Sequence, residues 1–190
     1  MPILGILASA ITGNLVTNSY ESISTVTVGG GGAASISFTS IPATYTHLQI
    51  RAIGRTTRAG ADNDALNMQF NADTGSNYSW HRLDGDGSSA SAGSGTSQTT
   101  IIVDRFTAAT ASASIFGTFV LDILDYANTN KYKTTRNLGG YDLNSSGLIT
   151  FASGLWQSTS AITSINLVSR NAGNLSQYSQ FALYGIKGSA

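Results

Sequence analysis

The chain of 190 residues contains no cysteine and only two prolines, and charged residues make up only 11% of it. Without cysteine the protein forms no disulfide and no thiolate metal site, which excludes a disulfide-stapled fold. The charged fraction is less than half of the roughly 25% that is typical of soluble domains. Hydrophobic residues nevertheless make up 41% of the chain, which at this length predicts a single domain with a substantial core.

The charges that are present cancel, because ten basic residues stand against ten acidic ones. Proteins that bind nucleic acids neutralise phosphates with clustered Lys and Arg, and this chain has no such cluster. No stretch approaches the roughly 20 apolar residues that a membrane-spanning helix needs. The composition therefore predicts neither nucleic acid nor a membrane as a partner.

The first 18 residues form an apolar, uncharged segment ahead of the first strand-like run. The segment contains no Lys or Arg, and its apolar run is shorter than that of a normal signal peptide. We therefore expect residues 1–18 to be an arm that packs against this subunit or a neighbour, followed by a single domain over residues 19–190. The candidate partner-binding side chains of this arm are Ile3, Leu4, Ile6, Leu7, Ile11 and Leu15.

Alternation of apolar and polar residues with a period of two dominates the rest of the chain, and no helical pattern exceeds about two turns. About ten short strand-like runs recur between turn residues, from residues 22–28 to residues 181–186. This pattern predicts an all-β fold, either an antiparallel sandwich or a barrel. Exposed sheet edges normally carry charge that prevents edge pairing. Because this chain has little charge, we expect partners, including further copies of itself, to cover its edges and faces.

Four segments carry more specific predictions. The glycine tract at residues 29–32 lies between two strand-like runs and predicts a hairpin turn. Residues 85–98 are almost wholly Gly, Ser, Ala and Thr, which predicts a flexible loop. The apolar run at residues 116–124 predicts a central strand buried on both faces, and the polar run at residues 131–136 predicts an edge strand.

Candidate catalytic groups are few. His47 and His81 are the only histidines, and no Gly-x-Ser-x-Gly elbow is present. Paired carboxylates act in glycosidases, and the candidates here are Asp104, Asp122, Asp125 and Asp142. Because Asp122 interrupts an apolar run, we expect it to be buried and paired with an arginine rather than catalytic; the candidate arginines are Arg51, Arg55 and Arg105. The sequence therefore predicts that the protein is not an enzyme.

Two oxygen-rich segments, residues 62–64 and 84–87, lack the further ligand spacing of a Ca²⁺-binding loop and match ordinary turn chemistry. We therefore predict no metal and no cofactor. Four aromatic residues lie at or near the ends of predicted strands, where they could stack on sugar rings or anchor a protein interface. They are Tyr126, Tyr132, Tyr141 and Trp156; ordinary packing in the core or at its rim is the alternative role.

Several segments, taken together and in order, carry a family resemblance: SYESI at residues 19–23, IP at 41–42 with THLQIR at 46–51, NYSWHRL at 77–83, DYANTNKYK at 125–133 and FALYGIKG at 181–188. They resemble small virion structural proteins of tailed bacteriophages over nearly the whole chain. The resemblance implies a jelly-roll-like β-sandwich, often a homotrimer, that is assembled with other virion proteins in the host cytoplasm. None of these segments is a catalytic signature, so the resemblance implies no active-site residues.

Within this group the resemblance leaves the position in the virion open. A capsid decoration or cement protein, bound to the major capsid protein and stabilising the head, is the first interpretation. A head-fibre or tail-fibre module that recognises host-surface glycans through Tyr- and Trp-bearing loops is the alternative. A glycan depolymerase that uses the aspartates is the third and least favoured interpretation.

Overall fold

The computed structural model describes residues 19–188, and all the regular secondary structure in that range is β-strand. The twelve strands are β1 (Tyr20–Thr27), β2 (Ser35–Phe38), β3 (His47–Gly54), β4 (Asn63–Phe70), β5 (Tyr78–Gly85), β6 (Ala90–Gln98), β7 (Ile101–Thr107), β8 (Gly117–Leu124), β9 (Lys133–Asp142), β10 (Gly147–Trp156), β11 (Ile165–Ser169) and β12 (Gln180–Ile186). Nothing in residues 19–188 is a helix long and apolar enough to cross a membrane.

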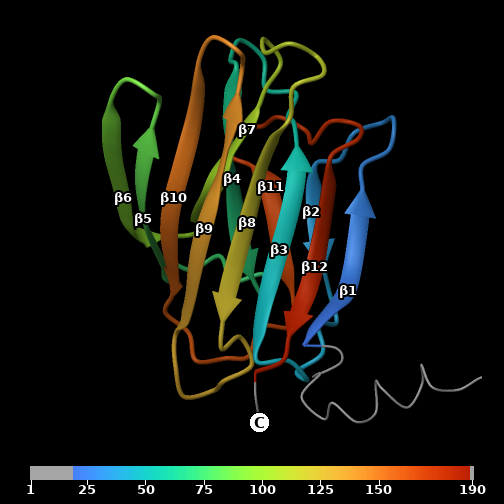
Figure 1. The fold of residues 1–190 in the computed structure, drawn as a ribbon. Coiled ribbons are helices and arrows are strands. Elements are labelled where there is room, and N and C mark those ends of the chain that lie inside the picture. Colours follow the sequence, from blue (N-terminus) through green and yellow to red (C-terminus); the bar gives the residue numbers. More distant parts are fainter. Residues whose placement is uncertain (1–18, 189–190) are drawn as a thin grey trace, which may run out of the picture.

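Two antiparallel sheets lie face to face and form a β-sandwich (Figure 1). The larger sheet has eight strands in the order β1-β12-β3-β8-β9-β10-β5-β6, and the smaller has four in the order β2-β11-β4-β7. From β1 to β5 successive strands alternate between the two sheets, and the β5–β6 and β9–β10 hairpins each place two consecutive strands in the larger sheet. The predicted all-β sandwich is therefore confirmed.

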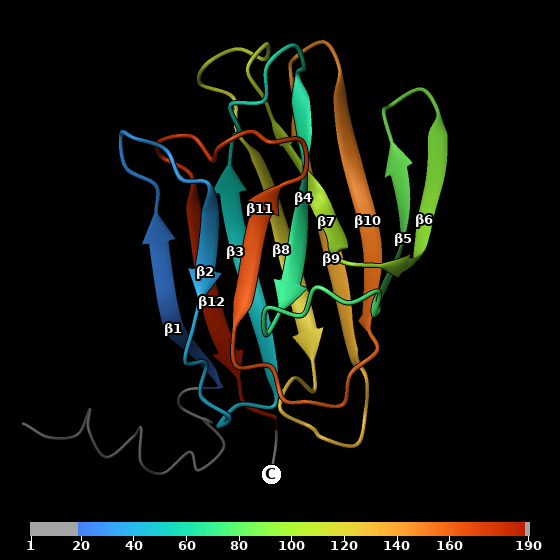
Figure 2. The same ribbon diagram turned by 180° about the vertical axis from the view of Figure 1, so that it is seen from behind.

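The larger sheet is wider than the smaller one. Seen from the side of the smaller sheet, the β5–β6 hairpin stands beyond β7 on one side and β1 stands beyond β2 on the other (Figure 2). The outer face of the larger sheet has no third layer over it in the described chain (Figures 1 and 2). This asymmetry leaves a broad sheet face toward solvent.

The core forms where alternate residues of the two sheets meet. In β3, Leu48, Ile50 and Ala52 are buried, whereas the residues between them point outward. A cluster of three phenylalanine rings joins the sheets, since Phe106 of β7 lies 5.5 Å from Phe119 of β8 and 5.8 Å from Phe181 of β12, measured between ring centroids. A second aromatic cluster, of Phe70, Tyr78 and Trp156, continues the same core under β5 and β10.

Residues 131–136 do not form an edge strand, because β9 lies inside the larger sheet between β8 and β10. Its polar inward side chains find partners in the interior. Lys133 is fully buried, and its Nζ donates to the carbonyls of Asn128, Lys131 and Thr159 at 2.6, 2.8 and 3.1 Å. A buried cation that is hydrogen-bonded in this way is tolerated in a central strand.

The prediction for residues 116–124 is half right. The strand β8 is central, but it is buried on one face only, because its outer face belongs to the uncovered side of the larger sheet. Val120 is consequently 40% exposed. Asp122 also lies on this outer face and is not buried, so the expected buried pairing of Asp122 with an arginine is wrong.

The prediction of a flexible loop over residues 85–98 is wrong for most of its length. Residues 90–98 form β6, which pairs with β5, and only the residues between the two strands form a turn. The small residues of β6 are needed because large side chains of β5 lie across them. A Cβ at Gly95 would lie 2.8 Å from ring atoms of Trp80, and a Cβ at Gly93 would lie 3.2 Å from Nε of Arg82.

The glycine tract at residues 29–32 does not close a hairpin. The strands on either side of it belong to different sheets, since β1 pairs with β12 and β2 pairs with β11. The tract instead carries the chain from one sheet to the other, with Gly32 at a positive φ of 69°.

Candidate functional site

The outer face of the eight-stranded sheet carries most of the large apolar side chains that solvent reaches. Among the described residues nine such side chains are at least 40% exposed, and seven of them lie on this face: Tyr20, Ile53, Leu83, Val120, Leu138, Ile149 and Phe151. Soluble monomers rarely expose apolar side chains in one contiguous patch of this kind. This face is therefore the strongest candidate for an interaction surface.

The pairing register places four of these side chains in one unbroken row. Leu83 of β5 is opposite Phe151 of β10, which is opposite Leu138 of β9. Leu138 is in turn opposite Val120 of β8. Directly opposed residues of neighbouring strands point to the same side of a sheet, so these four residues form a continuous apolar row.

A polar row runs beside the apolar row, and on each strand the two rows are two residues apart. It consists, in cross-strand order, of Gln49, Asp122, Arg136, Ser153 and His81. Asp122 accepts a hydrogen bond from Nε2 of Gln49 at 2.7 Å, whereas Arg136 makes no ion pair within residues 19–188. An apolar centre with a polar margin is the composition of a protein–protein interface.

Arg51 ends the apolar row on β3, where it is opposite Val120. Its guanidinium lies over two tyrosine rings, 5.2 Å from the centroid of Tyr20 and 5.4 Å from that of Tyr184. Its Nε also donates to Oε1 of Gln49 at 2.9 Å. These contacts hold the guanidinium in place on the surface, and Arg and Tyr are the residues most enriched at energetically important interface positions.

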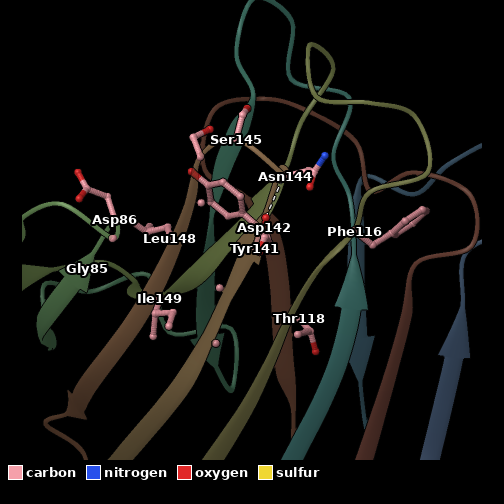
Figure 3. Close-up of a pocket in the computed structure, with 15 residues that line it drawn as sticks. Gly85, Asp86, Phe116, Thr118, Tyr141, Asp142, Asn144, Ser145, Leu148 and Ile149 are labelled. Atoms are coloured by element: carbon pink, nitrogen blue, oxygen red, sulfur yellow. Dashed lines mark hydrogen bonds between the residues drawn. The ribbon is translucent and has the colours of Figure 1, made fainter.

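An open hollow of about 920 Å³ lies at one end of this face, between the β5–β6 and β9–β10 turns. In Figure 3 Tyr141 stands between Asp86 on one side and Phe116 on the other. Oδ1 of Asp142 accepts a hydrogen bond from the backbone N–H of Asn144 at 2.7 Å, which shapes the β9–β10 turn. Burial, with a smaller contribution from the negative charge of Asp62, raises the pKa of Tyr141.

The four aromatic residues singled out from the sequence do not form one site. Tyr141 lines the hollow and Tyr132 is exposed, at opposite ends of β9. Tyr126 and Trp156 are buried, so an exposed glycan-binding role for them is wrong. The Tyr126 hydroxyl donates to the carbonyl of Pro42, and Nε1 of Trp156 donates to Oδ2 of Asp73 at 2.7 Å.

Other sequence candidates are also distributed over the molecule. The arm residues Ile3, Leu4, Ile6, Leu7, Ile11 and Leu15 lie outside the described residues. Asp125 lies close to Lys131 and His47, with Oδ2 2.7 Å from Nζ of Lys131, and this contact lowers the pKa of Asp125. Within residues 19–188 no three His, Cys, Asp or Glu side chains gather as a metal site would require.

The buried carboxylates lie between the sheets rather than on a surface. Oδ2 of Asp84 lies 2.9 Å from Nε of Arg82 and 3.0 Å from Nη1 of Arg105, and its Oδ1 accepts from Thr150 at 2.9 Å. Asp104 lies nearby on β7, and its burial raises its pKa to about 7. These groups are enclosed by packed strands, so they stabilise the polar half of the interior.

Comparisons with protein-family models, with curated proteins and with solved structures found no match for this chain.

The apolar row was not identified from the sequence. The signal for it was present in the alternation of residues 148–151, but that alternation does not say which of its two faces is covered.

Proposed function

We propose that this chain is a structural protein of a phage virion and acts as a capsid decoration or cement protein. In this role it binds the major capsid protein as a homo-oligomer and stabilises the head. The sequence resemblance supports the virion assignment. The single structural observation that supports an assembly role is the apolar row on the outer face of the larger sheet.

The physical reason is the free energy of burying that row. Apolar surface removed from water contributes roughly 25 cal/mol per Å², before the cost of ordering the partners. A face with Leu83, Phe151, Leu138 and Val120 side by side gains this free energy only when a protein surface covers it. Decoration of a large shell offers many identical contacts of this kind.

The arm supplies the second contact in this proposal. Its six apolar side chains between Ile3 and Leu15 would bind the capsid protein, while the sandwich contacts sister copies. Deletion of residues 2–15 tests this division: we expect loss of co-sedimentation with capsids that lack the protein, and an unchanged melting temperature of the sandwich. Capsid binding that survives the deletion would contradict the role of the arm.

The hollow favours one alternative, a fibre module that binds host-surface glycans. Tyr141 offers an aromatic ring, and Asp142, Asn144 and Ser145 offer oxygen and nitrogen atoms to hydroxyl groups. Aromatic faces combined with a few polar groups are the usual means of holding a small polar ligand.

A further inference from the structure

We propose that the outer face of the larger sheet binds the same face of a second copy, about a two-fold axis parallel to the strands between β8 and β9. This contact is the one between sister copies in the proposed function, so the inference rests on that function and deepens it. It also differs from the trimer that the sequence resemblance implies. The argument rests on the cross-strand register of the exposed residues.

The proposed axis lies on the midline of the larger sheet. Four strands, β1, β12, β3 and β8, lie on one side of it, and β9, β10, β5 and β6 lie on the other. Rotation about this axis turns the second sheet over but does not shift it along the strands, so residues of one cross-strand row face residues of the same row in the other copy. It therefore places β8 of one copy against β9 of the second, and β3 against β10. Two sheets packed face to face keep their strands roughly aligned, about 10 Å apart.

The rotation brings apolar side chains together. Val120 and Leu138 are opposite each other across the midline, so Val120 of one copy meets Leu138 of the other. Ile53 and Ile149 belong to one row through Thr118 and Gly140, and they are equally far from the midline on opposite sides. Each therefore meets the other in the second copy. Four of the seven exposed apolar side chains thus gain apolar partners.

The rotation also brings opposite charges together. Asp122 and Arg136 are opposite each other across the midline, so Asp122 of each copy meets Arg136 of the other, and the dimer contains two such contacts. Arg51 and Phe151 are equally far from the midline in the apolar row. Arg51, already held by Tyr20 and Tyr184, then lies over the ring of Phe151 from the second copy. In a two-fold interface, if one residue contacts a second residue across the interface, the same contact occurs again with the two copies exchanged, as it does for these pairs.

The charge pair fixes the position of the axis. A shift by one strand, to the line between β9 and β10, would place Arg136 against Ser153 instead of Asp122. Such a contact would also leave Ile53 opposite Ala90, at the edge of the sheet. Only the midline axis pairs Asp122 with Arg136, and a charge-reversal experiment distinguishes the two positions.

The first test is the mass in solution, by light scattering coupled to size exclusion. We expect the full chain to have twice the mass of 19.7 kDa, and Leu138→Asp to be monomeric with unchanged circular dichroism. The matched control is Asn166→Asp on the outer face of the smaller sheet, where the new carboxylate still accepts from the Ser37 hydroxyl; it should remain dimeric. A monomeric or trimeric wild type, or a dimeric Leu138→Asp, would overturn the proposal.

The second test needs no variant in the apolar row. In a homodimer of Asp122→Arg, arginine faces arginine at both contacts, and in a homodimer of Arg136→Asp, aspartate faces aspartate. Each variant alone should therefore dimerise at least about tenfold more weakly than wild type. An equimolar mixture should recover the wild-type affinity as a heterodimer, because the arginines of one chain then face the aspartates of the other. If the mixture is no tighter than the separate variants, the midline axis is wrong. Capsid binding is not measured in either test, so their failure leaves the proposed function to its own experiment.

Discussion

Asp104 and Asn137 form a buried side-chain pair between the two sheets, with Nδ2 of Asn137 donating to Oδ2 of Asp104 at 2.9 Å. Both residues are only 1% exposed, and Oδ1 of Asp104 accepts from the backbone N–H of Arg105 at 2.6 Å. Oδ1 of Asn137 has no hydrogen-bond partner in the described structure. A protonated Asp104 could donate to this oxygen after rotation of the amide. The pair is therefore suited to a neutral carboxyl group, in agreement with the raised pKa.

This pair makes the stability of the sandwich pH-dependent. Burial raises the pKa of Asp104 to about 7 in the folded protein, against about 3.9 in an unfolded chain. The stabilising contribution is complete below about pH 4 and is lost as the pH rises through about 7. Asp104→Asn removes this dependence. Between pH 5 and pH 8 the wild type should lose roughly 2 kcal/mol of unfolding free energy, measured by urea unfolding, that the variant does not lose. Equal pH slopes for the two proteins would contradict the assignment.

The ion pair between Asp84 and Arg105 stabilises the same polar interior. Arg105→Met should destabilise the protein by roughly 2 kcal/mol, less than the 3–5 kcal/mol for loss of a sole partner, because Arg82 still faces Asp84. The measurement is the denaturant midpoint. Arg170→Met, at an exposed position, is the matched control and should change stability by less than about 0.5 kcal/mol. An equal effect of both substitutions would refute the role of the ion pair.

The strand β6 depends on its small residues. Gly95→Val should destabilise the protein by about 1–3 kcal/mol, because the new side chain overlaps the Trp80 ring. The matched control is Ser94→Thr on the outward side of β6. Gly87 in the β5–β6 turn is unsuitable as a control, because its positive φ of 90° strains any substitution although a Cβ there would meet no other atom. Hydrogen exchange should show protected amides across residues 90–98 where β6 bonds to β5. If these amides exchange at unprotected rates, residues 90–98 are a flexible loop and the assignment of β6 is wrong.

The hollow provides the test of the glycan-binding alternative. On a panel of host polysaccharides, a fibre module should bind through Tyr141, and Tyr141→Ala should lower its affinity at least about tenfold, as loss of an interface aromatic does. Tyr132→Ala, at the other end of β9, is the matched control and should bind normally. Saccharide binding that ignores Tyr141 would rule out this hollow as the site.

The sequence predicted the architecture because alternation was regular where apolar residues face the core. In β3 the buried residues Leu48, Ile50 and Ala52 alternate with outward ones, and the strand was placed correctly. The prediction for β6 failed because its composition matches a linker. The reason for its glycines lies in Trp80, a residue of a different strand that the local sequence does not identify.

The interaction face was not predictable for a related reason. In β10, Thr150 points inward because Asp84 of β5 accepts its hydroxyl, and Ile149 and Phe151 therefore point outward. Local hydrophobicity alone favours the opposite orientation. The aromatic candidates failed similarly, since the hydrogen-bond partners of Trp156 and Tyr126 are Asp73 and Pro42, both distant in sequence.

The central claim is that this protein decorates a capsid, and co-sedimentation with empty capsids that lack it tests this claim most directly. We predict that purified protein saturates the capsids at a fixed number of copies and raises their melting temperature. The Leu138→Asp variant, added in parallel, reports whether contacts between copies contribute. Wild-type protein that stays in the supernatant at saturating concentration, with an unchanged capsid melting temperature, would contradict the claim.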